Sequence, residues 1–144
     1  VIAFDPNMRL RLWPSRAVMA EIITQAAAIS DMILPSFDED GAVFGDDSPE
    51  ATIARYRARG AETVVVKNGV DMIHARSGTE GAITFQPTPA ENVVDTTAAG
   101  DSFNAGLIAA LSRGESLAEG IARAAALSAR VIAARGALVA DAVR

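Results

Sequence analysis

The first half of the chain alternates short apolar runs with longer amphipathic stretches. The runs cover residues 1–4, 32–34 and 63–66 and are apolar or β-branched at almost every position, which is typical of strands covered on both faces. No hairpin signal joins one run to the next, so we expect parallel strands linked by helices in right-handed crossovers. The pattern therefore predicts a βαβαβ unit.

A helix is predicted between the first two runs, because Pro14 and Ser15 suit a helix start. The apolar residues that follow at helical spacing are Val18, Ile22, Ala26 and Ile29. We expect this stripe of the helix to pack against the rest of the unit.

A second helix is predicted between the second and third runs. Ser48 and Pro49 supply an N-cap and a first-turn proline, and Gly60 suits the C-cap. The acidic residues 38–40 that precede this helix are typical of an exposed loop.

After the third run the pattern predicts a hairpin at one side of the sheet. Apolar residues 72–75 and 83–85 flank a loop over residues 77–81 that is rich in Gly, Ser and Thr. We therefore expect the sheet to be mostly parallel, with this hairpin added to it.

Two Ala-rich helices are predicted to close the chain. The first follows Gly100 and ends near Gly114. The second begins with the capping box of Ser116 and Glu119 and runs to Gly136. No repeat, charge block or low-complexity linker divides the sequence, so residues 1–144 are expected to form a single α/β domain.

Composition narrows the function classes. Thirteen Lys and Arg against 18 Asp and Glu give a net charge of −5 without any basic block, which argues against a nucleic-acid partner. The absence of Cys excludes disulfides and thiolate metal sites and is compatible with a cytoplasmic location. The longest Ala-rich stretch, residues 121–134, is interrupted by Arg123 and Arg130, so no membrane partner is expected. Because the chain starts at Val1 rather than Met, we expect it to be the C-terminal part of a longer polypeptide.

Polar residues follow each of the three predicted strands. They are Asp5, Asn7 and Arg9 after the first strand, Ser36, Asp38 and Glu39 after the second, and Lys67, Asn68, Gly69 and Asp71 after the third. Ligands of open α/β sheets bind outside the carboxyl ends of the strands, so we expect these side chains to gather at one edge.

Residues 95–106 carry the strongest chemical signal of the sequence. They form a loop of small residues that runs directly into a helix, so several backbone N–H groups can converge on an anion. Asp101 stands at the mouth of that helix, where an ionised carboxylate is favoured and can accept a hydroxyl proton. An anion site beside a base points to phosphoryl transfer. The alternative is a plain helix entry, with Thr96 or Thr97 as its cap.

This stretch resembles the C-terminal signature of the ribokinase-like, phosphofructokinase-B type carbohydrate kinases. Within that family, the sequence is similar to the kinases of 2-keto-3-deoxygluconate. The stretches that carry this similarity are residues 4–9, 12–13, 34–39, 65–69 and 95–103. The resemblance covers essentially the whole chain but only the C-terminal half of such a kinase. It implies a three-layer α/β/α fold and an ATP-dependent transfer of phosphate to a sugar-acid hydroxyl, assisted by Mg²⁺.

The resemblance also implies roles for residues at the reacting centre. Asp101 aligns with the catalytic base, and Ala98, Ala99 and Gly100 align with the anion hole that holds the transferring phosphoryl group. Many relatives have Gly where this chain has Ala98. Arg9 aligns with a residue that pairs with the carboxylate of the sugar acid.

Further roles concern the nucleotide and the metal. The nucleotide-binding residues implied by the resemblance are Asn7, Lys67, Asn68, Gly69 and Asp71 near the phosphates and ribose, and Ala125 and Ser128 at the adenine pocket. Glu39 aligns with a residue that organises Mg²⁺ through water, although Ser36 replaces the Asn that usually precedes it in this element.

Two alternatives stay open at this point. One is another kinase of the same family, for a ketohexose, ribose or nucleoside, and the other is a nucleotide-binding fragment without catalysis. A Rossmann dehydrogenase and a Walker-type ATPase are disfavoured, because neither Gly-x-Gly-x-x-Gly after the first strand nor a Gly-Lys-Ser/Thr loop is found. The expected partners are ATP and a small sugar acid, and a homo-oligomer is compatible with the sequence.

Overall fold

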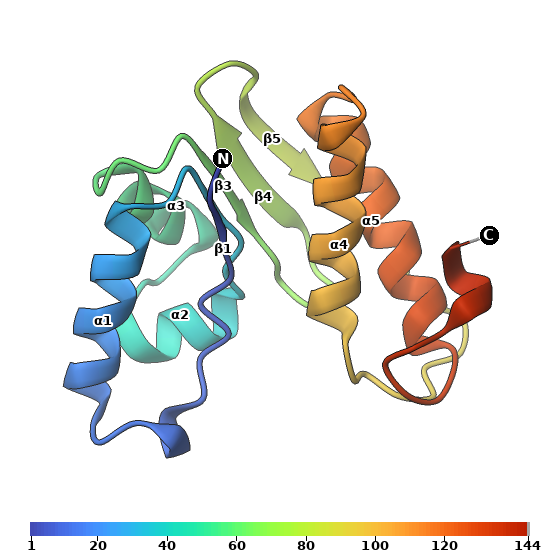
Figure 1. The fold of residues 1–144 in the computed structure, drawn as a ribbon, viewed down its shortest axis with the longest axis horizontal. Helices are drawn as coiled ribbons and strands as arrows, with labels where there is room; N and C mark the ends of the chain where they lie inside the picture. Colours follow the sequence, from blue (N-terminus) through green and yellow to red (C-terminus); the bar gives the residue numbers. More distant parts are fainter. Residues whose placement is uncertain (144) are drawn as a thin grey trace. The chain divides into compact units, whose positions relative to one another are not determined.

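The structure is a computed structural model that describes residues 1–143. Within these residues the chain forms one five-stranded sheet and five α-helices (Figure 1). It divides into two compact units, the first spanning Val1–Thr84 and the second beginning at Phe85.

The sheet has the strand order β1-β2-β3-β4-β5. Its strands are β1 (Ala3–Phe4), β2 (Met32–Ile33), β3 (Thr63–Val66), β4 (Ile73–Ser77) and β5 (Gly81–Phe85). β1 pairs in parallel with β2, and β2 with β3, whereas β3 and β4 are antiparallel. The predicted βαβαβ unit and the hairpin at one side of the sheet are therefore confirmed, and the third strand has the predicted bounds.

The first strand differs from the prediction of a buried strand over residues 1–4. β1 is shorter, and Ile2 is 53% exposed. The reason is that β1 stands at the edge of the sheet, with no further strand beside it among the described residues. The hairpin strands are longer than predicted, because they include alternating polar positions such as Arg76 that the apolar runs did not reveal.

Three helices of the first unit pack on the sheet face that presents Val64 and Val66 (Figure 1). They are α1 (Arg16–Ala28), α2 (Phe37–Phe44) and α3 (Pro49–Arg57). Ser15 and Ser48 cap α1 and α3 as predicted, by accepting hydrogen bonds from Val18 N and Ala51 N. A short 3-10 turn, Leu10–Leu12, precedes α1.

Two predictions for this region are wrong. The acidic residues 38–40 lie in helix α2, not in an exposed loop, and Asp40 is fully buried. Helix α3 ends at Arg57 with Ala58 as its C-cap, so Gly60 lies two residues beyond the cap.

The predicted buried stripe of α1 is also wrong. Val18, Ile22 and Ile29 are 39%, 43% and 72% exposed, whereas Met19 and Ile23 are buried. The helix has apolar residues on two neighbouring stripes one residue apart, so spacing alone does not say which of them faces inward. The inner stripe is chosen by Met8, Phe4 and Trp13, which pack with Met19 and Ile23 into one cluster.

The second unit is built around a closely packed helix pair, α4 (Ala99–Ser112) and α5 (Leu117–Ile132). A Cβ atom on Gly106 would lie 3.0 Å from Ala124 Cα, and one on Gly120 would lie 2.9 Å from Leu107 Cδ1. Glycine at these two positions therefore permits the close approach of the helices. The capping box of α5 is present as predicted, and a 3-10 turn, Ala140–Val143, follows that helix.

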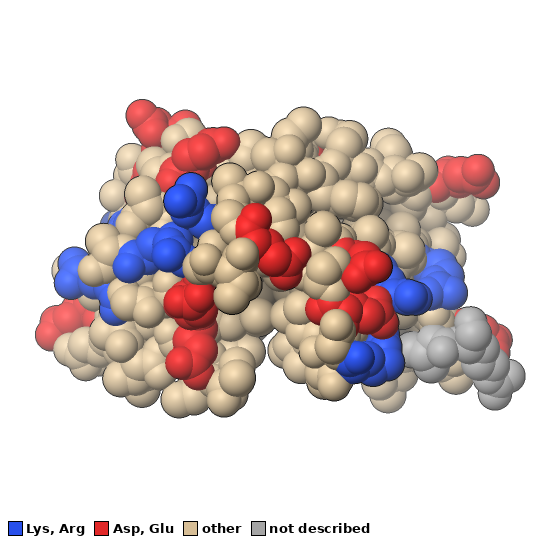
Figure 2. Space-filling model, turned by 90° about the horizontal axis from the view of Figure 1, so that it is seen from above, with Lys and Arg blue, Asp and Glu red and all other residues tan. Residues whose placement is uncertain are grey.

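No helix in the described part of the chain is long and apolar enough to cross a membrane. On the face drawn in Figure 2, Lys and Arg side chains lie among Asp and Glu side chains.

The two stripes of α1 can be compared directly by substitution. Ile23→Ala is expected to lower the free energy of unfolding by about 3 kcal/mol, because it leaves a cavity in the cluster of Met8 and Met19. Ile22→Ala is expected to cost less than about 1 kcal/mol, since Ile22 is half exposed and Ala favours helix. Urea unfolding of both variants measures the difference, and equal losses would contradict the assignment of the inner stripe.

Candidate functional site

In the second unit, the 95–101 segment leads into the N-terminus of α4. The N-cap residue is Ala98, with φ 62° and ψ 17°, and it has no side-chain capping bond. The bond from Ser102 N to the Ala98 carbonyl, 2.9 Å long, is the first of the helical pattern, so the N–H groups of Gly100 and Asp101 lie ahead of it. The alternative in which Thr96 or Thr97 is the cap is therefore wrong, and the first turn presents backbone donors.

The Asp95 carboxylate holds the 95–101 segment in place by two hydrogen bonds. Its Oδ1 accepts a hydrogen bond from Thr97 N at 2.9 Å, and its Oδ2 accepts one from Gly136 N at 3.0 Å. Hydrogen bonds from the Thr97 side chain, and then from the backbone of Thr97 and Gly136, lower the pKa of Asp95 from its ordinary value. Asp95 therefore remains a charged acceptor that ties the segment to the chain following α5.

A second support comes from two hydroxyl groups on one carbonyl. Ser102 Oγ and Ser128 Oγ donate to the Ala99 carbonyl oxygen at 3.0 and 2.9 Å. Ser128 belongs to α5, so this bond fixes the first turn of α4 to the neighbouring helix. The Ser128 hydroxyl thus supports the loop. Ser128 does not line the cavity between α5 and residues 85–92.

A cavity of about 410 Å³ lies between α5 and residues 85–92, within the second unit. Its wall on α5 is formed by Arg130 and by four small residues, Ala122, Ala125, Ala126 and Ala129, and Ala133 at the C-cap extends it. The volume is within the range of small-molecule sites. Ala125, which the resemblance places at the adenine pocket, is one of the residues that line this cavity.

Asp101 is the third residue of α4 and is exposed. A carboxylate in the first turn interacts favourably with the partial positive charge of the helix N-terminus. Asp101 thus stands beside the first-turn donors and is open to an incoming hydroxyl group.

In the first unit, Asp5 joins the ends of two strands. Its Oδ2 lies 2.9 Å from Lys67 Nζ, and its Oδ1 accepts a hydrogen bond from Asn7 N at 2.9 Å. Asn7 has a positive φ of 39°, a conformation that Asn tolerates better than most residues. Lys67 directly follows the central strand β3, and its side chain is only 12% exposed.

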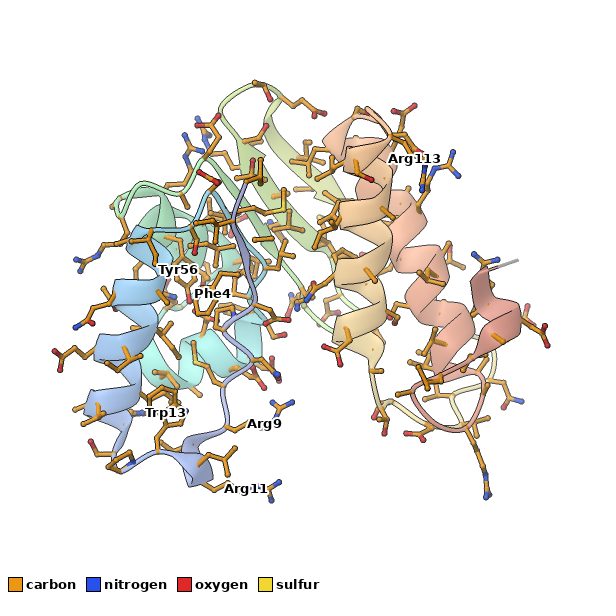
Figure 3. All side chains as sticks on the ribbon, viewed as in Figure 1. Phe4, Arg9, Arg11, Trp13, Tyr56 and Arg113 are labelled. Atoms are coloured by element: carbon orange, nitrogen blue, oxygen red, sulfur yellow. The ribbon has the colours of Figure 1, made fainter. Side chains whose placement is uncertain are left out.

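Glu39, on α2, clamps the segment that follows β1. Its Oε2 accepts a hydrogen bond from Met8 N, and its Oε1 accepts one from Arg9 Nη1, both at 3.0 Å. Arg9 Nη1 also donates to the Met8 carbonyl. The Nε and Nη2 groups of Arg9 have no partner among residues 1–143, and Figure 3 shows Arg9 and Arg11 extending from the ribbon. Arg9 is therefore oriented by one nitrogen and offers two others to a ligand.

The remaining predicted residues lie at the ends of β2 and β3. Ser36 and Lys67 form a parallel bridge, and Phe37 N donates to the Lys67 carbonyl at 2.8 Å. Beyond Lys67 the chain turns at Gly69, with φ 61°, and Asp71 N donates to the Asn68 carbonyl. The structure therefore brings the strand-end residues of the first unit to one edge of the sheet.

The donor set for a divalent cation is sparse. Within the described chain, no three His, Cys, Asp or Glu side chains gather in a possible metal cluster, and both oxygens of Glu39 already accept hydrogen bonds. Mg²⁺ usually keeps several waters and binds phosphate oxygens. The described residues therefore fit a Mg²⁺ ion that contacts Glu39 through water. They do not fit an ion that is bound directly by several side chains.

One set of residues next to Glu39 could not be predicted from the sequence. Asp40 is fully buried and accepts hydrogen bonds from Arg55 and Tyr56. Nothing in the acidic run distinguishes Asp40 from its exposed neighbours, because its burial depends on contacts with another helix.

A family model described as pfkB family carbohydrate kinase matches residues 1–141. The chain belongs to this family.

Individual proteins are similar to the chain in sequence and in structure. The 2-dehydro-3-deoxygluconokinase of Escherichia coli strain K12 is 35% identical over 140 residues, which cover 96% of this chain and 45% of that protein. The structure of an aminoimidazole riboside kinase from Salmonella enterica, in complex with aminoimidazole riboside and an ATP analogue, has a TM-score of 0.81 and 33% identity over 94% of this chain and 46% of that one. A PfkB protein from Polaromonas sp. JS666 has a TM-score of 0.82 and 32% identity, over 91% and 42%. The chain spans less than half the length of these relatives.

The strained backbone at Ala98 gives a direct test of the loop geometry. Ala98→Gly is expected to raise the free energy of unfolding by about 0.5–1 kcal/mol, because relief of the left-handed strain exceeds the added entropy of the unfolded chain. Ala105→Gly, at an exposed position inside α4, is the matched control and is expected to lower it by about 1 kcal/mol. Urea unfolding distinguishes the two signs, and a loss of stability in Ala98→Gly would mean that Ala98 does not adopt the positive φ.

Proposed function

We propose that this chain is the nucleotide-binding and base-bearing part of an ATP-dependent kinase that phosphorylates a hydroxyl of a sugar acid, 2-keto-3-deoxygluconate. The observation that carries the proposal is the N-terminus of α4, where uncapped backbone donors and Asp101 stand together. Membership of the pfkB family supports the reaction class.

In the proposed reaction, Ala98, Ala99 and Gly100 form the anion hole that binds the phosphoryl oxygens. The N–H group of Gly100 lies ahead of the first helical bond and can donate to them, whereas Ala99 N already donates to the Thr96 carbonyl at 3.2 Å. The Asp101 carboxylate accepts the proton of the attacking sugar hydroxyl. ATP supplies the γ-phosphoryl group when bound, and Mg²⁺ neutralises part of its charge. Phosphoryl transfer needs mainly positioning and charge stabilisation, which fixed backbone dipoles provide without reorganisation.

The sugar acid is assigned through Arg9. A guanidinium group with two N–H donors on one edge suits a carboxylate, which it can bind in two-pronged fashion. Arg9 keeps its Nε and Nη2 groups for such a ligand, since only Nη1 is used in the bonds to Glu39 and Met8. The similarity to 2-dehydro-3-deoxygluconokinase supports the same substrate class.

The proposed nucleotide-binding residues are those that the family resemblance implies. We propose that Asn7, Lys67, Asn68, Gly69 and Asp71 contact its phosphates and ribose, and that Ala125 contacts its base. Residues 1–144 would then act as one nucleotide-binding domain, the C-terminal part of a longer kinase. The isolated chain is expected to bind nucleotide with negligible turnover, because it spans less than half of its relatives.

Nucleotide binding is tested by calorimetric titration of Mg-ADP and Mg-ATP into the chain. Saturable binding is expected, and Gly100→Val is expected to weaken it by at least about tenfold, because added bulk prevents a phosphate from approaching the backbone. Ala105→Val places the same side chain at an exposed position of the same helix and is expected to bind as the parent chain does. A folded chain that binds neither nucleotide, or equal binding by Gly100→Val, would contradict the proposal.

A kinase for a neutral sugar or a nucleoside is the second candidate, favoured by the similarity to aminoimidazole riboside kinase. NMR of the arginine Nε–H groups distinguishes the two candidates. Titration with 2-keto-3-deoxygluconate is expected to shift the Arg9 signal, whereas fructose and a nucleoside leave it unchanged, since only the acid carries a carboxylate.

Two variants complete this experiment, with the Met8 amide signal as the reporter. Arg9→Lys keeps the charge but loses the two-pronged geometry, so its response to the acid should disappear. Arg11→Lys, two residues along the same exposed segment, should respond like the parent chain. A response to fructose as large as that to the acid would favour the second candidate.

A further inference from the structure

A buried ionic cluster joins α2 to α3 in the first unit. Its members, here called the α2–α3 cluster, are Asp40, Asp46, Thr52, Arg55 and Tyr56. Asp40 is fully buried, and its Oδ1 accepts hydrogen bonds from Arg55 Nη2 at 2.6 Å and from the Tyr56 hydroxyl at 2.7 Å. Burial raises the pKa of Tyr56 far above its ordinary value, so the hydroxyl remains a donor.

Arg55 is fixed on several sides at once. Its Nη2 and Nε groups donate to Asp46 at 2.7 and 3.0 Å, and Thr52 Oγ1 donates to the same carboxylate at 2.9 Å. The Arg55 guanidinium also lies 3.8 Å from the ring centroid of Phe44 and 4.2 Å from that of Tyr56. The side chain that reaches Asp40 therefore has little freedom to move.

The burial of the charged groups of the α2–α3 cluster costs free energy. Asp40 Oδ2 is buried without a hydrogen-bond partner among the described residues. Buried ion pairs are often no more stabilising than apolar side chains of the same size, whereas they do impose a defined geometry. The cluster is therefore better explained by the position that it enforces than by the stability that it adds.

The element that it positions is α2, which is weak on its own. This helix has eight residues, includes Gly41, and begins at Ser36 without a side-chain cap. So short a helix is unstable in isolation and takes its geometry from tertiary contacts. Asp40 directly follows Glu39, so a shift of Asp40 moves the carboxylate that holds Met8 and Arg9.

We propose that the α2–α3 cluster is the positioning device of the sugar-acid site. Asp40, Arg55 and Tyr56 are positioning residues that hold α2, so that Glu39 clamps Met8 N and orients Arg9. The role of Arg9 toward a sugar acid rests on the proposed function, but the coupling from Tyr56 to the Glu39 clamp does not.

The coupling is tested by amide hydrogen exchange of the Met8 N–H, followed by NMR in this chain without any ligand. Tyr56→Phe removes only the hydroxyl that donates to Asp40. We expect the exchange rate of the Met8 N–H, relative to that of Val65 in the central strand β3, to rise by about tenfold. The reason is that loss of the Tyr56 hydroxyl loosens α2 and thereby the hydrogen bond from Met8 N to the Glu39 carboxylate. Glu39→Gln, which alters the acceptor itself, serves as the reference for a disturbed clamp.

Ile53→Val is the matched control. Ile53 is a buried apolar residue of α3 in the same core as Tyr56, but its side chain takes no part in the hydrogen bonds and ion pairs of the α2–α3 cluster. It is expected to lower overall stability while leaving the ratio of the Met8 and Val65 rates within about twofold of the parent value. Equal ratios in Tyr56→Phe and Ile53→Val would overturn the proposal.

A second variant covers the case in which Tyr56→Phe does not fold. Thr52→Val removes only the hydroxyl bond to Asp46 at the rim of the cluster, and we expect a rise of about threefold in the same ratio. No rise in Thr52→Val would then overturn the proposal. The failure of the proposed function would be recognised separately, as an Arg9 signal that ignores the sugar acid while the Met8 ratio still responds to Tyr56→Phe.

Discussion

The parallel pairing of β1, β2 and β3 is the constraint on which the chemistry of the first unit depends. Phe4 stands opposite Ile33, and Ile33 opposite Val64, so the three strands run in register and leave the sheet in the same direction. The residues that follow them are thereby forced together although they are up to 62 positions apart, as in the pair of Asp5 and Lys67. Charged groups that would be solvated in a flexible chain become partners at this edge. Their positions are set by the backbone hydrogen bonds that pair the strands.

The two units fix their functional groups by different means. In the first unit, carboxylates do so: Asp5 holds Lys67 and Asn7, while Glu39 holds Met8 and Arg9. In the second unit, the groups presented to a ligand are backbone donors, and the first turn of α4 is held by Asp95 and Ser128. The side chains of Asp95 and Ser128 act as supports, and the residues at the start of α4, Ala98, Ala99 and Gly100, are all small.

The sequence predicted those features that depend on local chemistry. The bounds of β3, the N-caps Ser15 and Ser48 and the capping box of Ser116 were predicted correctly, since each is decided within a few residues. The inward stripe of α1 was not, because Met8 and Trp13 select Ile23 over Ile22 from a distance. The same limit applies to the site. Strand-end residues such as Lys67 could be placed from topology alone, whereas the burial of Asp40 depends on Arg55 and Tyr56 of another helix.

Gly106 and Gly120 have a significance beyond the packing of two helices. Neither lies in the 95–101 segment, yet they set the spacing at which the Ser128 hydroxyl of α5 reaches the Ala99 carbonyl of α4. A methyl group on Gly106 would press on the backbone of Ala124, push the helices apart and stretch that bond at the far end of the pair. A methyl group on Gly120 would first displace the end of the Leu107 side chain. A substitution of Gly106 would therefore have two effects, because it would disturb both the packing of the helix pair and the position of the first turn of α4, which Gly106 does not contact.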